Sequence, residues 1–149
     1  MVRHVTNRHA SMSMRLSKEI SRTQFTVTAS PNELSLLPVK INGSGPYTFI
    51  FDTGASCCCI ATDVARKLKI KKRKKVPASG ADGSYEAYHG VANTISIGRA
   101  LRRNIDVAIF DFDTLRKVDE NIAGIIGYNF LRSYTIIIDY EQNELLLYK

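Results

Sequence analysis

The sequence predicts a mostly β domain, because its apolar segments have the length and composition of strands. Runs such as YTFIF and TIIID are rich in aromatic and β-branched residues. Turn dipeptides such as Asn-Gly and Asp-Gly separate these runs, and no long helical pattern or internal repeat interrupts them. No run approaches the roughly 18 apolar residues of a membrane-spanning helix.

The strands are expected at regular intervals along the chain. They are predicted within residues 24–29, 33–41, 47–51, 104–111 and 122–126, in a long hairpin over residues 76–98, and in a closing hairpin over residues 134–149. Asn42-Gly43 favours a tight hairpin turn, and further turns are expected at Asp82-Gly83, near Gly98 and around Gln142-Asn143.

Two short helices complete the expected domain. Residues 63–69 place Val64 and Leu68 on one face, and Thr62 or Asp63 is available as the N-terminal cap. A second short helix is expected after Gly127.

Charge and composition divide the 149 residues into two parts. Residues 1–24 are expected to form a basic, flexible arm, and residues 25–149 the folded domain. The arm has no continuous apolar core, so it is not a secretory signal; an organelle-targeting role stays open, and a cytoplasmic location is the default. Its net charge is four positive, and residues 66–75 add eight positive charges, whereas the remainder of the chain is mildly acidic. The overall charge of +7 is therefore local and does not by itself indicate nucleic-acid binding.

The only cysteines are three consecutive residues, Cys57, Cys58 and Cys59. Adjacent cysteines rarely form a disulfide with each other, and the set lacks the spacing of a structural zinc site. We expect small buried side chains in a reducing compartment, and neither a metal nor another cofactor.

Asp52 follows an apolar run and precedes a glycine turn in FIFDTGAS, residues 49–56. An aspartate at such a place commonly opens a turn by accepting backbone hydrogen bonds. Phe49 and Phe51 indicate a strand packed inside the domain, so the carboxylate lies near buried surface, where its charge must be compensated. The residues alone leave both a turn residue and a catalytic carboxylate open.

Two motifs together resemble the retropepsin-like aspartic proteases. FIFDTGAS is followed some seventy residues later by GIIGYNFL, residues 124–131, and the resemblance covers roughly residues 37–149. It implies an all-β, closed or partly open acid-protease barrel, formed by a single lobe with a flap hairpin and one or two short helices.

The resemblance also implies roles for individual residues. Asp52 would be catalytic, and the remaining site residues would fall into three groups: the active-site loop Thr53, Gly54, Ala55 and Ser56; the supporting strand Ile125, Ile126 and Gly127; and the flap tip Asp82, Gly83, Ser84 and Tyr85. Thr53 would bond the partner loop, and Ser56 the outer oxygen of the carboxylate.

Catalysis in this class needs two carboxylates about 3 Å apart that share one proton. The ionised partner activates a water, and the protonated one polarises the peptide carbonyl. Asp113-Thr114 is the only other Asp-Thr, but Leu115 replaces the glycine. The chain therefore has one half-site, and a two-fold homodimer would supply Asp52 twice. The C-terminal segment 144–149 is a candidate interface, because an apolar edge strand tends to pair.

Two other classes of function stay open. The same fold can serve as a non-catalytic dimerisation or peptide-binding module. Alternatively, the basic run 66–75 could tether the protein to nucleic acid or to a membrane surface, although no aromatic residue interleaves with it. A peptide or protein substrate is the favoured partner, because a binding module has no need of an intact Asp-Thr-Gly.

Overall fold

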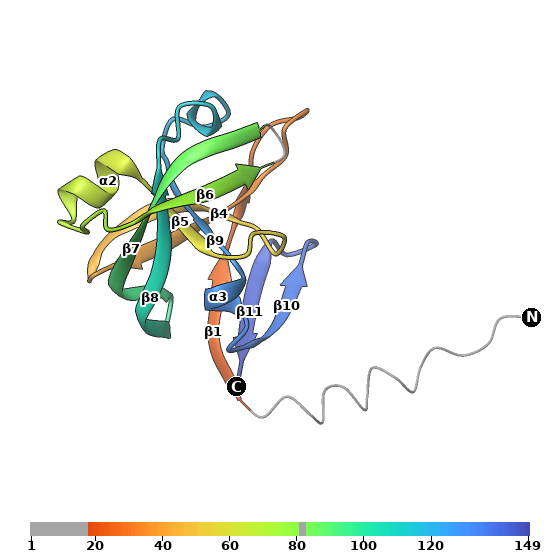
Figure 1. Cartoon of the computed structure of the whole chain (residues 1–149). Coiled ribbons are helices and arrows are strands. Elements are labelled where there is room, and N and C mark those ends of the chain that lie inside the picture. Colours follow the sequence, from red (N-terminus) through yellow and green to blue (C-terminus); the bar gives the residue numbers. More distant parts are fainter. Residues whose placement is uncertain (1–17, 81–82) are drawn as a thin grey trace, which may run out of the picture.

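The computed structural model describes residues 18–80 and 83–149. The predicted all-β class is confirmed, with two short α-helices and one 3-10 helix in this part of the chain (Figure 1). The elements are β1 (Glu19–Gln24), β2 (Thr26–Val27), β3 (Ser35–Ile41), β4 (Ser44–Phe51), β5 (Cys58–Ala61), α2 (Thr62–Lys67), β6 (Lys75–Gly80), β7 (Gly83–Ile97), β8 (Ala100–Phe110), η1 (Leu115–Lys117), β9 (Ile122–Ile126), α3 (Tyr128–Leu131), β10 (Thr135–Asp139) and β11 (Glu144–Tyr148).

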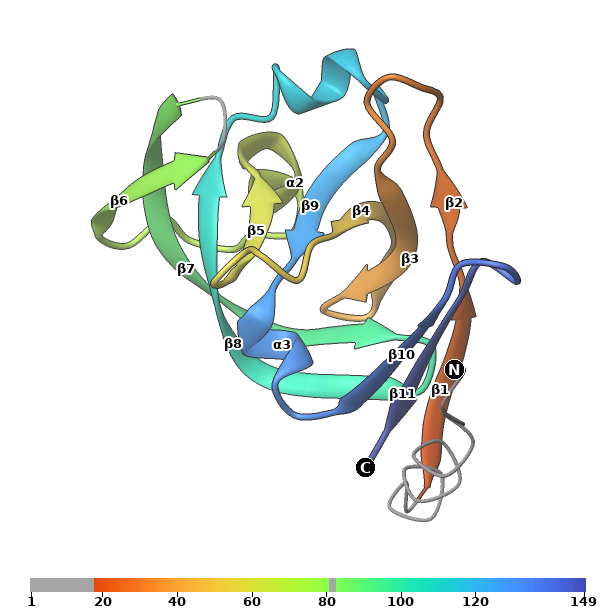
Figure 2. The same cartoon turned by 90° about the vertical axis from the view of Figure 1, so that its right-hand side faces the viewer.

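The larger sheet has eight strands in the order β2-β3-β4-β9-β5-β8-β7-β6. It curls until β3 also pairs with β7, through Lys40 opposite Ser96 and Ile41 opposite Ile95. This additional pairing turns the sheet into a partly closed barrel (Figure 2). The barrel interior is filled by fully buried side chains such as Phe49, Ile60 and Ile109.

The smaller sheet lies against one end of the barrel and has the order β1-β11-β10 (Figures 1 and 2). It corrects two expectations. Residues 19–24 were assigned to the flexible arm, but they form β1, which pairs antiparallel with β11. The C-terminal strand is not an open edge, because β11 lies between β1 and β10 of the same chain. Leu145, Leu146 and Leu147 are buried there, so residues 144–149 are not an unpaired dimer edge.

The hairpin turns follow from local sequence chemistry. Asn42 and Gly43 join β3 to β4 with φ values of 50° and 76°. Positive φ at both positions is typical of the two-residue turns that Asn-Gly favours, so this predicted hairpin is confirmed. The turn near Gly98, with φ of 55°, and the closing hairpin between β10 and β11 are also confirmed.

Helix α2 was predicted in the right place but with the wrong cap. Its N-cap residue is Ala61, which makes no side-chain hydrogen bond, so neither Thr62 nor Asp63 caps it. The Asp63 carboxylate instead forms an ion pair with Arg116, at 3.0 Å. The helix is held by the burial of Val64 and Ala65 against the barrel.

No helix within residues 18–80 and 83–149 combines the length and the apolar character needed to cross a membrane.

Ser21 tests whether β1 is an integral part of the fold. Its buried hydroxyl donates to the carbonyl oxygen of Ile97 at 2.9 Å and accepts from the backbone nitrogen of Arg99 at 3.3 Å. Ser21→Ala is expected to lower the free energy of unfolding by about 1–3 kcal/mol, since it removes the side-chain partner of the buried Ile97 carbonyl oxygen and of the partly buried Arg99 amide. Urea unfolding measures this. The exposed Ser44→Ala is the control, and equal stability of both variants would contradict a structural role for β1.

Candidate active site

Asp52 is the first residue after β4, at the start of a tight loop. Its backbone nitrogen donates to the carbonyl oxygen of Ile126 at 3.1 Å, and its carboxylate Oδ1 accepts from the backbone nitrogen of Gly54 at 2.8 Å. The residue is exposed in the isolated chain. The loop therefore orients one carboxylate oxygen with a backbone amide and leaves the carboxylate facing outward.

The second motif lies directly beside this loop. Strand β9 runs between β4 and β5, parallel to β4 with Phe51 opposite Ile126, and antiparallel to β5 with Cys59 opposite Ile125. After the strand, the backbone nitrogen of Tyr128 donates to the carbonyl oxygen of Ala55 at 2.8 Å. Two segments some seventy residues apart in sequence thus form one backbone unit around Asp52.

Gly127 is the point of closest approach between the two segments. A Cβ at this position would lie 2.6 Å from the carbonyl carbon of Cys57 and 2.9 Å from the carbonyl oxygen of Ala55, and closer still to the Cys57 oxygen. Since these are backbone atoms, no side-chain movement relieves the contact. The glycine is needed for packing, which explains its place after Ile125-Ile126.

Thr53, Gly54 and Ser56 form the exposed part of the loop. A Cβ at Gly54 would lie 3.2 Å from the Asp52 carboxylate, so this glycine keeps the space beside the carboxylate open. The hydroxyls of Thr53 and Ser56 lie on the same exposed loop as Asp52. Their expected roles toward a partner loop or the outer carboxylate oxygen stay predictions.

The cysteines pack as predicted: Cys58 and Cys59 are buried, and Cys57 is half-buried. The neighbouring Cys59 thiol lowers the pKa of Cys57 to about 6, whereas burial raises the pKa of Cys58 to about 11. The Cys58 sulfur also accepts a hydrogen bond from the backbone nitrogen of Gly127, at 3.5 Å. The cysteines therefore support the packing under the loop. Within the described ranges, no three His, Cys, Asp or Glu side chains gather as a metal site requires.

Asn129 is a supporting residue that the sequence analysis missed. Its side-chain oxygen accepts from the backbone nitrogen of Cys58 at 2.8 Å, and its amide donates to the carbonyl oxygen of Asp106 at 2.7 Å. The residue therefore joins the end of the active-site loop to β8. In the sequence, the one feature that could have indicated this role is the position of an amide side chain in the first turn of the short helix after Gly127.

The expected flap is the hairpin of β6 and β7, in which Ser79 pairs with Ser84 and Gly80 with Gly83. Asp82 lies outside the described residues. Ser84 is exposed, but the Tyr85 ring stacks on Phe110 with centroids 5.0 Å apart. Tyr85 thus packs against the barrel and does not extend from a free tip.

Two other acidic residues are separate from the Asp52 loop. The carboxylate of Asp106 accepts a hydrogen bond from the His89 ring at 2.8 Å. Asp113 is exposed, in a turn after β8, and Leu115 begins the 3-10 helix, so no glycine loop forms there.

Gly127→Ala is expected to destabilise the protein, because its Cβ meets backbone atoms of the active-site loop. The free energy of unfolding should fall by about 1–3 kcal/mol or more, the usual cost of overpacking. Gly54→Ala is the matched control: its contact is with a side chain at 3.2 Å, so its effect on thermal unfolding should be clearly smaller. An equal loss of stability in Gly127→Ala and Gly54→Ala would contradict the assignment of Gly127 as the point of closest approach between the two segments.

Comparisons with known proteins agree with this geometry. A retropepsin-like aspartic protease from Rickettsia conorii aligns with a TM-score of 0.56 and 19% identity over 87% of this chain and 93% of its own. EIAV protease in complex with the inhibitor HBY-793 aligns with a TM-score of 0.51 and 19% identity, over 72% of this chain and 93% of its own. The retroviral protease-like domain of Ddi1 from Leishmania major aligns with a TM-score of 0.51 and 17% identity, over 76% of this chain and 87% of its own.

A search of curated proteins found no match. The profile of the aspartyl protease family matches residues 37–130, which include the Asp52 loop, β9 and Gly127. The chain therefore belongs to the aspartyl protease family and has the retropepsin-like fold.

Proposed function

We propose that the protein is a homodimeric aspartic endopeptidase in which each subunit supplies Asp52. One observation carries the proposal: the chain has a single Asp-Thr-Gly loop, and its carboxylate is oriented by Gly54 yet exposed. Among the described residues, no second carboxylate is hydrogen-bonded to it. A second copy related by a two-fold axis supplies the missing carboxylate, because such an axis brings identical residues together.

The two carboxylates would then share one proton, since two like charges so close cannot both ionise. The ionised Asp52 accepts a proton from a bound water while that water attacks the peptide carbonyl carbon. The protonated Asp52 of the partner donates a hydrogen bond to the carbonyl oxygen as negative charge develops there. The backbone amide of Gly54 holds Oδ1 in place during this transfer. Thr53 is proposed to bond the partner loop.

The substrate would be an extended peptide, bound by strand pairing beneath the β6–β7 hairpin. The exposed backbone of Gly83 and Ser84 is proposed to contact it, together with Asp82. Tyr85 is proposed to support the hairpin through its stacking on Phe110.

The free edge of β10 is the proposed dimer contact. The smaller sheet ends in β1 on one side and β10 on the other. The β1 edge carries Arg22, paired with Glu19 at 3.0 Å and with Glu144 at 2.7 Å, and charged side chains discourage edge pairing. On β10, Ile136 and Ile138 pack partly against the core, and Ile137, which points to the opposite face, is half-buried. Pairing of two β10 edges would cover Ile137 further and would satisfy the backbone groups along this edge.

Asp52→Asn tests the catalytic assignment. Hydrolysis of a peptide library should fall by several orders of magnitude, because the amide cannot accept the water proton. In the native chain, specific activity should rise with protein concentration and be higher at acidic pH, where the pair keeps its shared proton. Mass spectrometry of the cleaved peptide library measures the loss of activity in Asp52→Asn and the dependence of native activity on protein concentration and on pH. Equal activity in both proteins, or no cleavage by the native dimer at any pH, would refute the peptidase and favour a non-catalytic binding module.

Ile137→Lys tests the dimer contact. A lysine on an edge strand disfavours pairing, so the dimer dissociation constant should rise by about tenfold or more. Val27→Lys is the matched control, because Val27 is 46% exposed on β2, the edge of the other sheet. Sedimentation velocity measures the dissociation constants, and peptidase activity at low protein concentration should fall only for Ile137→Lys. An unchanged dimer dissociation constant for Ile137→Lys would mean that the dimer contact does not involve the β10 edge.

A further inference from the structure

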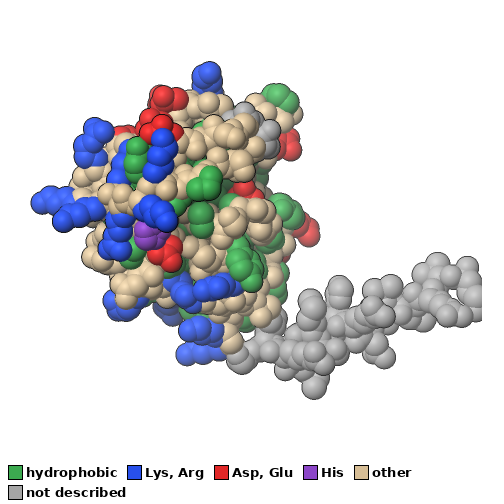
Figure 3. Space-filling view, viewed as in Figure 1, with side chains coloured by type: hydrophobic (Ala, Val, Ile, Leu, Met, Phe, Trp, Pro, Cys, Tyr) green, Lys and Arg blue, Asp and Glu red, His purple; other side chains and the backbone are tan. Residues whose placement is uncertain are grey.

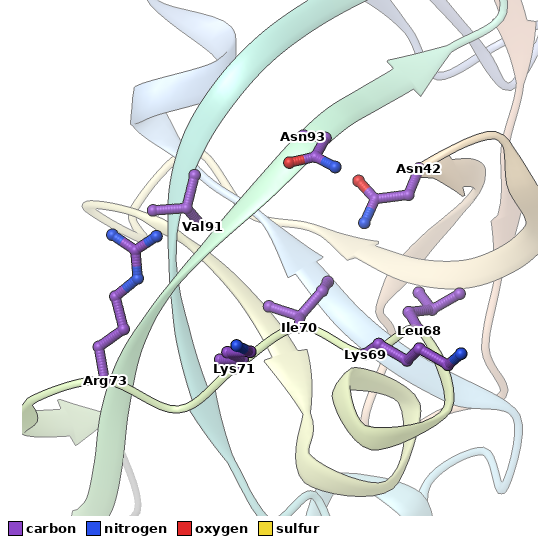
Figure 4. Close-up of a pocket in the computed structure, with 8 residues that line it drawn as sticks. All are labelled: Asn42, Leu68, Lys69, Ile70, Lys71, Arg73, Val91 and Asn93. Carbon is purple, nitrogen blue, oxygen red and sulfur yellow. The ribbon is translucent and has the colours of Figure 1, made fainter.

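A cavity of about 330 Å³ lies beside α2 (Figure 4), and none of its lining residues belongs to the Asp52 loop. The end of α2 and the segment after it form one side, β7 forms another, and the β3–β4 turn closes a third. The lining residues are Asn42, Leu68, Lys69, Ile70, Lys71, Arg73, Val91 and Asn93.

The cavity is positively charged and has no compensating anion. Lys69, Lys71 and Arg73 line it, and none of its lining residues is acidic. Within the part of the chain that the structure describes, these three cations form no ion pair. Nearby basic residues do: Lys75 pairs with Glu86 at 3.3 Å, and Arg116 pairs with Asp63. The cationic groups of the cavity are therefore available to a ligand. Lys and Arg side chains gather over this side of the molecule in Figure 3.

The segment that carries these cations is held in place. The backbone nitrogen of Arg73 donates to the carbonyl oxygen of His89 at 2.8 Å, and the nitrogen of His89 donates to the carbonyl oxygen of Lys74 at 2.7 Å. The segment after α2 packs closely against β7 at Gly90, which has no side chain. A Cβ there would lie 3.2 Å from Ile70 and 3.3 Å from the carbonyl oxygen of Lys71. Bonds to β7 thus fix the backbone that carries the three cations, so binding needs no ordering of this backbone, only of the side chains.

Lys69 occupies a backbone conformation that normally favours glycine. Its φ is 57°, directly after the helix, where a glycine is the common residue. A lysine at this position is unfavourable for the backbone. A role for the side chain in the cavity gives a physical reason for its presence.

Asn42 adds a neutral hydrogen-bond donor. Its side-chain oxygen accepts from the backbone nitrogen of Thr94 at 3.0 Å, and its backbone nitrogen donates to the carbonyl oxygen of Thr94 at 2.9 Å. With the oxygen used in this way, the side-chain NH₂ group is left for another acceptor. Figure 4 shows the amide of Asn42 beside that of Asn93 at the mouth of the cavity.

A second cavity, of about 240 Å³, shares Ile70 with the first and is lined by Thr62, Ala65, Arg66, Ile70 and Lys72. The hydroxyl oxygen of Thr62 is buried and has no hydrogen-bond partner within the described residues. Arg66 and Lys72 make this second cavity cationic as well. The two neighbouring cationic cavities therefore suit a ligand with more than one anionic group.

No aromatic side chain lines either cavity. Tyr88, the aromatic residue next to the basic segment, is covered by the ammonium of Lys72, 4.6 Å from its ring centroid. Base stacking is therefore not provided, whereas cations and amide donors suit phosphate oxygens. The surface favours recognition of phosphate groups over recognition of a nucleobase.

We propose that the two cavities on either side of Ile70 bind a small ligand with a chain of phosphate groups, held by Lys69, Lys71 and Arg73 with the Asn42 amide. This site is independent of the peptidase, since none of its residues belongs to the Asp52 loop.

Isothermal titration of the full chain with inorganic tripolyphosphate tests the proposal. Lys69→Gly and Arg73→Gln should each weaken binding by about tenfold, because each removes a charge-assisted hydrogen bond. Lys149→Gln, which removes the same charge at the far C-terminus, should change the affinity less than about twofold. Asp52→Asn should bind as the native chain does, which separates this site from the proposed catalysis.

Lys69→Gly also guards against a folding artefact. Glycine adopts the positive φ of this position without strain. The melting temperature of the Lys69→Gly variant should therefore equal or exceed that of the native chain, while its affinity for tripolyphosphate falls. Amide NMR shifts on addition of tripolyphosphate should centre on residues 69–73 and Asn42.

Three results would overturn the proposal: no binding of millimolar tripolyphosphate at low salt, equal weakening by Lys149→Gln, or shifts centred elsewhere. Single-stranded RNA and phosphatidylserine vesicles are the comparison probes. Binding of either one in the absence of tripolyphosphate binding would assign the basic segment to a nucleic acid or a membrane surface and would also refute a small phosphate ligand.

Discussion

The structure depends on the contact between two stretches of backbone, the Asp52 loop and the end of β9. Asp52 donates its backbone hydrogen to Ile126, Tyr128 donates to Ala55, and Gly127 lies so close to the loop that a side chain would collide with backbone. These contacts determine where β4, β5 and β9 run, and the barrel forms around them. They also explain why the Asp52 carboxylate can be exposed and still be oriented: backbone groups hold its loop, and the Gly54 amide holds its Oδ1.

In the proposed function, this contact builds one half of a catalytic site, and a second copy of the chain would supply the other half. The carboxylate faces outward on a single chain, and the sheet β1-β11-β10 ends in an apolar edge. In the proposed two-fold dimer, the second Asp52 would complete the site and the two β10 edges would pair with each other.

The basic residues belong to a different part of the fold. Ile70 is buried, and backbone bonds hold the segment after it against β7. The backbone that carries Lys69, Lys71 and Arg73 is therefore fixed, while their charged side chains are exposed and form no ion pair within the described residues. The basic run 66–75 thus lies on a part of the fold that contributes no residue to the Asp52 loop.

Local sequence determined much of this protein. Strand-length apolar runs predicted the all-β class, Asn42-Gly43 predicted its hairpin, and Asp52 with Gly127 predicted the family, because turn geometry and close backbone approach restrict residue type directly. Only the tertiary structure decided which strands meet. Glu19–Gln24 is polar and reads as an arm, yet it pairs with β11; Asn129 acquires its role through contacts with Cys58 and Asp106; and the cavity beside Lys69 exists because Asn42 and β7 are brought next to α2. Such long-range pairings depend on the packing of the whole chain, which no short stretch of residues encodes.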